Sequence, residues 1–194
     1  GGHLASAAMP LRLFGRSRTY LSMALLGLAT RTLATGAVVL RKQLTLEAAD
    51  TMASAAIAEA KSKGFNDISI SVVDATGREL VAKTQPNCPR LIPALARSKA
   101  GACIGTSAAT SRALKDKYVP DRTPQLLAMT TIASTTQPQG FAAVPGGVLC
   151  RDEAGDVIAA IGVSGASADE DEHCAIIAAQ AAGLITDPAQ SALQ

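Results

Sequence analysis

Residues 156–183 read DVIAAIGVSGASADEDEHCAIIAAQAAG, and this stretch carries the strongest fold signal in the sequence. Its opening apolar run is typical of a buried strand. Ser164 and Gly165 then predict a sharp turn. Ser167 and Glu170 have the spacing of a capping box, the pattern that begins a helix. We therefore expect a strand that turns directly into a helix. The core-facing stripe of that helix should consist of Cys174, Ile177, Ala178, Ala181 and Ile185.

The sequence around this stretch predicts further helices and two hairpins. Thr45 is a good N-cap and Gly64 a good terminator, so that they bound a first helix. Ile68, Ile70 and Val72 alternate with serines, as in a strand that buries one face. The remaining expected elements are a returning strand over 78–83, helices over 92–104, 107–118 and 124–132, and a second hairpin with strands over 148–150 and 156–163. This order implies an α/β (α+β) fold with an antiparallel sheet covered by helices.

Composition limits the classes of partner. The chain has 194 residues, of which 48% are hydrophobic but only 3% are aromatic. Aromatic side chains are the stacking platforms of proteins that bind single-stranded nucleic acid. The formal net charge of +2 combines two unlike parts. Before Glu47 there are six basic residues and no acidic one, whereas the remaining twelve basic and sixteen acidic residues give −4. A mildly acidic domain with few aromatics predicts no nucleic-acid partner.

Residues 1–43 form a basic N-terminal extension, followed by a domain over 44–185 and a tail over 186–194. The extension is rich in Arg, Ser, Thr and Leu and lacks acid, which is typical of an organelle-targeting presequence. Its longest apolar run, 23–29, is too short to span a bilayer. The alternative is a retained arm that docks on partner proteins or an anionic lipid surface. A presequence would place the protein in an organelle, a mitochondrion rather than a plastid; without one, it would be cytoplasmic.

The four cysteines predict neither a metal site nor a disulfide framework. Cys88, Cys103, Cys150 and Cys174 contain no C-x-x-C pair and no metal-finger spacing. We therefore expect reduced thiols, as in a protein that is not secreted. The chain has only two histidines, which leaves little room for a Ser or Cys triad. No catalytic residue is predicted, and an autonomous hydrolase is not expected.

Four short motifs give the domain a recognisable pattern. They are SISVVDATG over 69–77, SKA over 98–100, GGV over 146–148 and IGVSG over 161–165, with Asp171 and Ala175 fitting downstream. With these motifs, residues 44–184 resemble the GlcG/HbpS-like family of small haem-binding or haem-degrading proteins, which also occurs fused to corrinoid adenosyltransferases. The resemblance implies a profilin-like sandwich that assembles into dimers or larger rings. The sequence departs from the family pattern at Leu149, where Pro is usual, and in the loop over 87–90.

Haem binding of the kind this resemblance implies needs an axial donor, an apolar slot and cations for the propionates. The candidate donors are His173 and Met129, and the candidate cations are Arg97 and Lys99. Structural alternatives exist for three of them. His173 also fits a solvated helix histidine paired with Asp169, four residues before it. Met129 also fits a core side chain, and Lys99 a surface charge. Further candidate donors are Met52 and Tyr118.

Two functions from different classes are consistent with the sequence. In the first, which we prefer on the sequence, the domain is a non-catalytic accessory or assembly subunit of a larger organellar complex, docked through its basic extension. In the second, the protein binds haem or another tetrapyrrole and buffers or degrades it. Haem is thus a candidate cofactor, and a homo- or hetero-oligomer is expected. The scarcity of ligands favours the first function, and the family resemblance favours the second.

Overall fold

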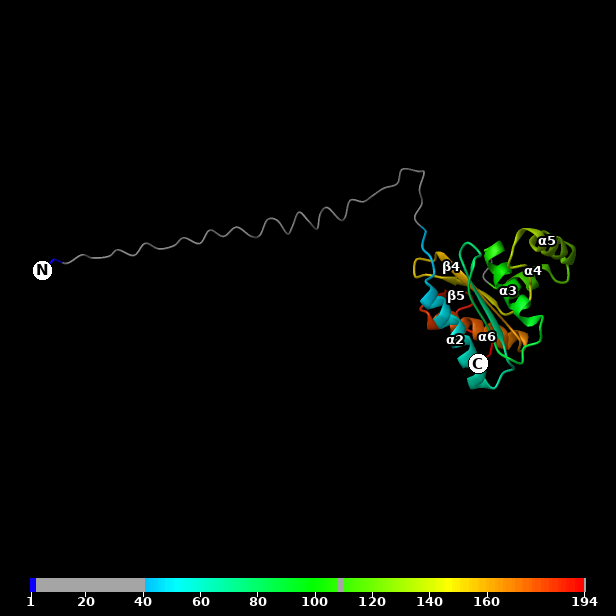
Figure 1. Cartoon of the computed structure of the whole chain (residues 1–194). Coiled ribbons are helices and arrows are strands. Elements are labelled where there is room, and N and C mark those ends of the chain that lie inside the picture. The colour runs from blue at the N-terminus through cyan, green and yellow to red at the C-terminus, as the bar shows by residue number, and fades with distance from the viewer. Residues whose placement is uncertain (3–40, 108–109, 194) are drawn as a thin grey trace, which may run out of the picture. The chain divides into compact units, whose positions relative to one another are not determined.

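The computed structural model describes residues 1–2, 41–107 and 110–193. The chain divides into the units Gly1–Arg41 and Lys42–Gln194, and the second contains every helix and strand described below. Nearly all of the basic extension, and with it the expected presequence or docking arm, lies outside the described residues. Figure 1 labels the helices of the second unit and the strands β4 and β5.

A five-stranded antiparallel sheet forms the centre of the second unit, with the strand order β2-β1-β4-β3-β5. Its strands are β1 (Ser69–Asp74), β2 (Glu79–Thr84), β3 (Gly147–Arg151), β4 (Val157–Ser164) and β5 (Ile185–Thr186). The register places a row of apolar residues across the sheet. Val72 pairs with Val81 and Ile161, and Ile161 also pairs with Val148. This row lies in the main core, and the predicted antiparallel sheet is confirmed.

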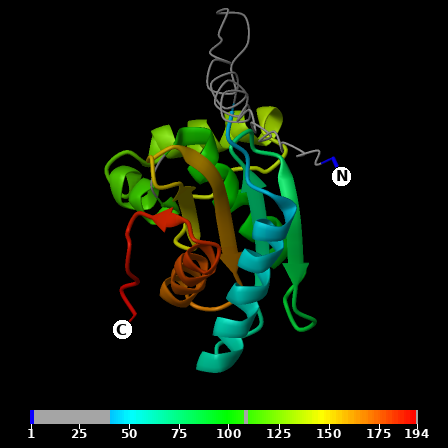
Figure 2. The ribbon, with the colours of Figure 1, turned by 90° about the vertical axis from the view of Figure 1, so that its left-hand side faces the viewer.

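Helices cover both faces of the sheet, which confirms the expected sandwich. On one face, α2 (Leu46–Lys63) packs against α6 (Ala168–Ala181); Figure 2 shows the two in front of the sheet. On the other face lies α3 (Ile92–Thr106), followed by α4 (Ser111–Tyr118) and α5 (Thr123–Thr136). The two short helices predicted between α3 and the second hairpin are present with shifted ends.

The helix ends form where the sequence places its capping residues. The side chain of Thr45 accepts a hydrogen bond from the Ala48 amide at the start of α2, and Gly64 ends that helix at a φ of 68°. At the start of α6, Ser167 Oγ accepts from the Glu170 amide, while a Glu170 carboxylate oxygen accepts from the Ser167 amide at 2.8 Å. The predicted capping box is therefore confirmed, and the acidic side chain at its third position has a structural role.

Two expectations about side-chain burial are wrong. The serines of β1 were expected to face solvent, but Ser69 and Ser71 are buried because α3 covers the second face of the sheet. Ser69 Oγ lies 2.8 Å from Thr84 Oγ1, and Ser71 Oγ donates to Glu79. Ala181 and Ile185 were expected in the core stripe of α6. Ala181 is the last residue of the helix and is exposed, and Ile185 instead lies in β5 with a half-exposed side chain.

Helix α3 lies so close to the sheet that two strand positions have no room for a side chain. A Cβ atom on Gly162 of β4 would fall far inside van der Waals contact with the carbonyl oxygen of Ala96. A Cβ atom on Gly147 of β3 would lie 2.5 Å from the carbonyl oxygen of Lys99. Both obstacles are helix backbone, which cannot move aside as a flexible side chain can. The glycines of the GGV and IGVSG motifs therefore set the distance between helix and sheet.

Gly162→Ala should destabilise the protein by at least about 3 kcal/mol, the upper part of the range for overpacked cores, because its methyl group meets backbone. Gly105→Ala in α3 is the matched control. Its methyl group would meet only the end of the Gln137 side chain, which can move, and Ala is a better helix former than Gly. Urea unfolding measures both variants. Equal and small effects would contradict the close approach of α3 to β4.

Candidate functional site

The four candidate ligand-binding residues lie on three helices and do not form one site. Arg97 and Lys99 are on α3, Met129 is on α5, and His173 is on α6. Because α6 and α3 cover opposite faces of the sheet, His173 is separated from the other three by the sheet (Figure 2). No hydrogen bond or ion pair among the described residues joins any two of the four. Each is therefore described with its own neighbours.

Lys99 is a buried structural cation. Its ammonium donates to an Asp171 carboxylate oxygen and to the Val163 carbonyl oxygen, both at 2.8 Å, and the residue is 1% exposed. Burial lowers the pKa of Lys99 and raises that of Asp171, and the attraction between the two opposes both shifts. The alternative of a surface charge is wrong. The contact joins α3 on one face of the sheet to α6 on the other.

Glycines make room for this ion pair. Gly146 has a φ of 116°, and a Cβ atom there would lie 2.8 Å from the Lys99 ammonium and 2.9 Å from Asp171 Cβ. The second carboxylate oxygen of Asp171 accepts from the Ala166 amide at 3.0 Å. The SKA, GGV and IGVSG motifs and Asp171 thus meet in one buried cluster. These motifs serve the fold, and they supply no free nucleophile or ligand.

Arg112 of α4 forms ion pairs with α6 that the sequence did not suggest. Its Nε donates to Glu172 at 2.7 Å, and its guanidinium also forms an ion pair with Asp169. Burial opposes ionisation of Arg112, but the hydrogen bonds that it donates to Asp169 and Glu172 raise its pKa overall. A cation of α3 is therefore paired with Asp171, and a cation of α4 with Asp169 and Glu172. No sequence signal links α4 to a carboxylate some sixty residues later, since the contact is purely tertiary.

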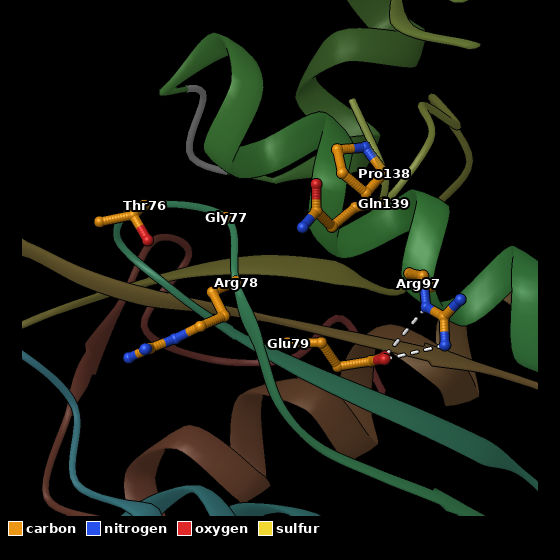
Figure 3. A pocket seen from close by; sticks show the side chains of 7 residues that line it. All are labelled: Thr76, Gly77, Arg78, Glu79, Arg97, Pro138 and Gln139. Carbon is orange, nitrogen blue, oxygen red and sulfur yellow. Dashed lines mark hydrogen bonds and ion pairs between the residues drawn. The ribbon is translucent and has the colours of Figure 1, made fainter. Parts of the chain in front are cut away.

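Arg97 borders an open hollow beside the turn between β1 and β2 (Figure 3). Its guanidinium forms two hydrogen bonds with Glu79, at 2.8 and 3.0 Å. Arg78, which points away from that pair in Figure 3, is bonded to the buried carboxylate of Asp74. The hollow measures about 470 Å³ and is lined by Thr76, Gly77, Arg78, Glu79, Arg97, Pro138 and Gln139. Because each arginine already has a carboxylate partner, the hollow attracts an anion only weakly.

Met129 is half-buried in a small apolar cluster under α5. It packs against buried residues that include Leu114 and Phe141, together with the half-buried Tyr118. Two other apolar side chains of α5, Leu127 and Ile132, are exposed. Met52, a further candidate donor, is completely buried in the main core. That Met129, Met52 or Tyr118 acts as a haem ligand stays a prediction. All three side chains pack in apolar clusters.

His173 is buried and lies against α2, so the expectation of a solvated histidine is wrong. It is 7% exposed, and its Nε2 lies 2.8 Å from a Glu59 carboxylate oxygen. The ring of Phe65 meets it edge-on, with centroids 6.2 Å apart. The predicted pairing with Asp169 does not occur, because Asp169 is bound to Arg112. The side of α6 that seemed polar in sequence is covered by α2.

The imidazole of His173 is held in a manner suited to binding a metal centre. Its Nδ1 is buried, and among the described residues it has no hydrogen-bond partner. A carboxylate that accepts from one ring nitrogen fixes the tautomer and leaves a lone pair on the other, as in most metal-ligating histidines. The residue borders an open hollow of about 450 Å³, lined by His173, Ile176, Ile177, Gln180, Ala189, Gln190, Ser191 and Leu193. An imidazole donor next to apolar side chains meets two of the requirements of haem, while the residues that line this hollow include no cation for the propionates.

The cysteines and the remaining polar residues offer no competing chemistry in the part of the chain that is described. All four thiols are free, and burial raises the pKa of Cys150 and of Cys174 to about 12. Such thiols are inert packing groups. Over the same residues, no cluster of three or more His, Cys, Asp and Glu side chains could hold a metal ion. No described helix is both long and apolar enough to cross a bilayer.

Comparisons with known proteins agree with this architecture. The model of the family described as haem degrading protein HbpS-like matches residues 44–180. A complex of PduOC with haem is 25% identical, covers 74% of this chain and 98% of its own, and has a TM-score of 0.62. HbpS is 27% identical, with coverages of 77% and 96% and a TM-score of 0.61. The ORFY protein of Klebsiella pneumoniae, 21% identical with coverages of 78% and 98%, shares the fold at a TM-score of 0.65. No curated protein matches.

Asp171→Asn should cost about 3 kcal/mol of stability or more, because it leaves the buried Lys99 ammonium without an opposite charge. Adding Lys99→Met removes that charge and should restore at least half of the loss. The exposed pair Lys83 and Asp50, whose charged atoms are 2.7 Å apart, is the control. Lys83→Met with Asp50→Asn should show a coupling below about 1 kcal/mol. Denaturant unfolding of both double-mutant cycles tests this, and equal coupling in the two cycles would contradict it.

Proposed function

The chain belongs to the HbpS-like haem degrading protein family, and from that premise we propose that it binds haem through the imidazole of His173. The family model covers most of the domain, and one of the similar structures is a complex with haem. The observation that carries the proposal is the state of His173. One ring nitrogen is bound to Glu59, and the other is buried without a partner among the described residues.

Each neighbour of His173 has a definite role in this proposal. Glu59 accepts from Nε2 and holds the ring in the tautomer that leaves the lone pair on Nδ1. Phe65 limits rotation of the ring from the other side. Ile176, Ile177 and Leu193 give the hollow an apolar wall beside the imidazole. Haem, when bound, would supply an iron that a nitrogen of His173 could hold.

The proposal assigns fewer residues to the cofactor than the sequence suggested. Lys99 is committed to Asp171, and Arg97 is bonded to Glu79 on the other side of the sheet. Neither cation can serve the hollow beside His173. Met129 belongs to the cluster under α5. We therefore place the site between α6 and the C-terminal residues, with His173 as the only candidate ligand that borders this hollow.

Haemin added to the purified protein should give a stoichiometric Soret shift, and His173→Gln should weaken binding at least about 100-fold. The glutamine amide can still donate to Glu59, so the fold is preserved while the imidazole is lost. Glu59→Gln, which removes only the orienting charge, should weaken binding about 10-fold to 100-fold. Met129→Leu is the control and should bind as the wild type does. Undiminished binding by a folded His173→Gln variant would refute the assignment.

A second candidate function is that of an accessory subunit in a larger organellar, mitochondrial, complex. It is favoured by the charge of the N-terminal extension, which carries six basic residues and no acidic one. In this proposal the extension docks on protein partners or on an anionic membrane surface, and the domain forms a homo- or hetero-oligomer. N-terminal sequencing of the protein isolated from its cells tests the docking. A mature terminus near Gln43 would exclude it.

A further inference from the structure

Residues 187–193 run beside α6 and form the outer wall of the hollow that His173 borders. Figure 2 shows this C-terminal segment in red beside α6 in orange. Ala189, Gln190, Ser191 and Leu193 line the hollow from this side, and Ile176 and Ile177 of α6 line it opposite. On the side of α2, Glu59 and Phe65 contact the ring directly.

The segment is weakly attached. Among the described residues, a single hydrogen bond joins it to α6, from Gln180 Nε2 to the Ala189 carbonyl oxygen at 2.6 Å. Residues 187–190 are exposed, and only Ser191 and Leu193 are half-buried. Segments with few buried contacts and few hydrogen bonds open locally at a small fraction of the global unfolding free energy.

The attachment is firm immediately before the segment. Thr186 and Ile185 pair with Cys150 and Arg151 of the neighbouring strand β3, and the Thr186 side chain is buried. Thr186 Oγ1 also donates to the Pro188 carbonyl oxygen at 2.8 Å. The chain thus passes from a fixed strand to a loosely held wall within about two residues, which is the arrangement of a hinge.

We propose that residues 187–193 act as a hinged wall that controls access to His173, with the hydrogen bond between Gln180 and Ala189 as its latch. The identity of the admitted ligand, haem, rests on the function proposed above. With the wall closed, the imidazole lies between α2, α6 and the segment and is 7% exposed. With the wall open, the ring and the buried side chain of Ile176 face solvent together, so an iron-bearing apolar ligand meets its donor and its apolar surface at once.

The access of His173 can be measured without haem. Diethyl pyrocarbonate acylates an unprotonated imidazole nitrogen, and mass spectrometry reports the modification of each histidine separately. His3 is the only other histidine of the chain and serves as the internal reference. Gln180→Ala removes the latch and should increase the modification rate of His173 about threefold to tenfold, the factor expected for the loss of one hydrogen bond. Asp187→Asn, in the same segment but outside the lining of the hollow and without a bond to α6, should leave the rate unchanged.

A variant truncated after Thr186 lacks the whole segment. Its rate of His173 modification should increase more than that of Gln180→Ala. An unchanged rate in both variants, with native circular dichroism, would overturn the hinged wall. Haemin association followed by stopped flow should accelerate by the same factor as the modification. If the modification accelerates but haemin does not bind, the wall stands and the haem proposal fails. If haemin binds to His173 while modification is unaffected, the wall fails and the haem proposal stands.

Discussion

The ammonium group of Lys99 ties the two helical layers together through the sheet. It extends from α3 past the end of β4, where it meets the Val163 carbonyl, to Asp171 at the start of α6. A buried charge is tolerated only with such partners, and its path exists only because residues 146 and 147 are glycines. The position of α6 therefore depends on this contact. Since His173 follows Asp171 by two residues on the same helix, the contact also sets where the imidazole lies.

The polar residues of the domain have two different roles, support of the fold and the proposed binding of haem. Three of the four family motifs, those over 98–100, 146–148 and 161–165, converge on the ion pair, so they support the fold. Arg112 and the acidic residues at the start of α6 extend the same network. Two buried side-chain polar atoms among the described residues have no hydrogen-bond partner, Oε1 of Glu172 and Nδ1 of His173, and of these two residues only His173 lines the hollow beside the C-terminal segment. A buried polar atom without a partner costs free energy, which a ligand would recover.

Local features were predictable from the sequence, and tertiary ones were not. The capping box of Ser167 and Glu170, the helix bounded by Thr45 and Gly64, and the antiparallel order of the strands follow from near neighbours, and all are confirmed. The burial of Ser69 and the pairing of His173 with Glu59 depend on which helix covers which face. Residue type alone favours a surface position for Lys99, because lysine is almost never fully buried unless it is paired. Its partner, Asp171, is distant in the sequence.

The central claim is that haem binds to the imidazole of His173. A crystal structure of the protein grown with haemin tests this claim directly. The account predicts iron bonded to a ring nitrogen of His173, the other nitrogen still bound to Glu59, and residues 187–193 displaced from their position against α6. Haem bound elsewhere, with His173 still enclosed by Glu59, Phe65 and the C-terminal segment, would contradict it.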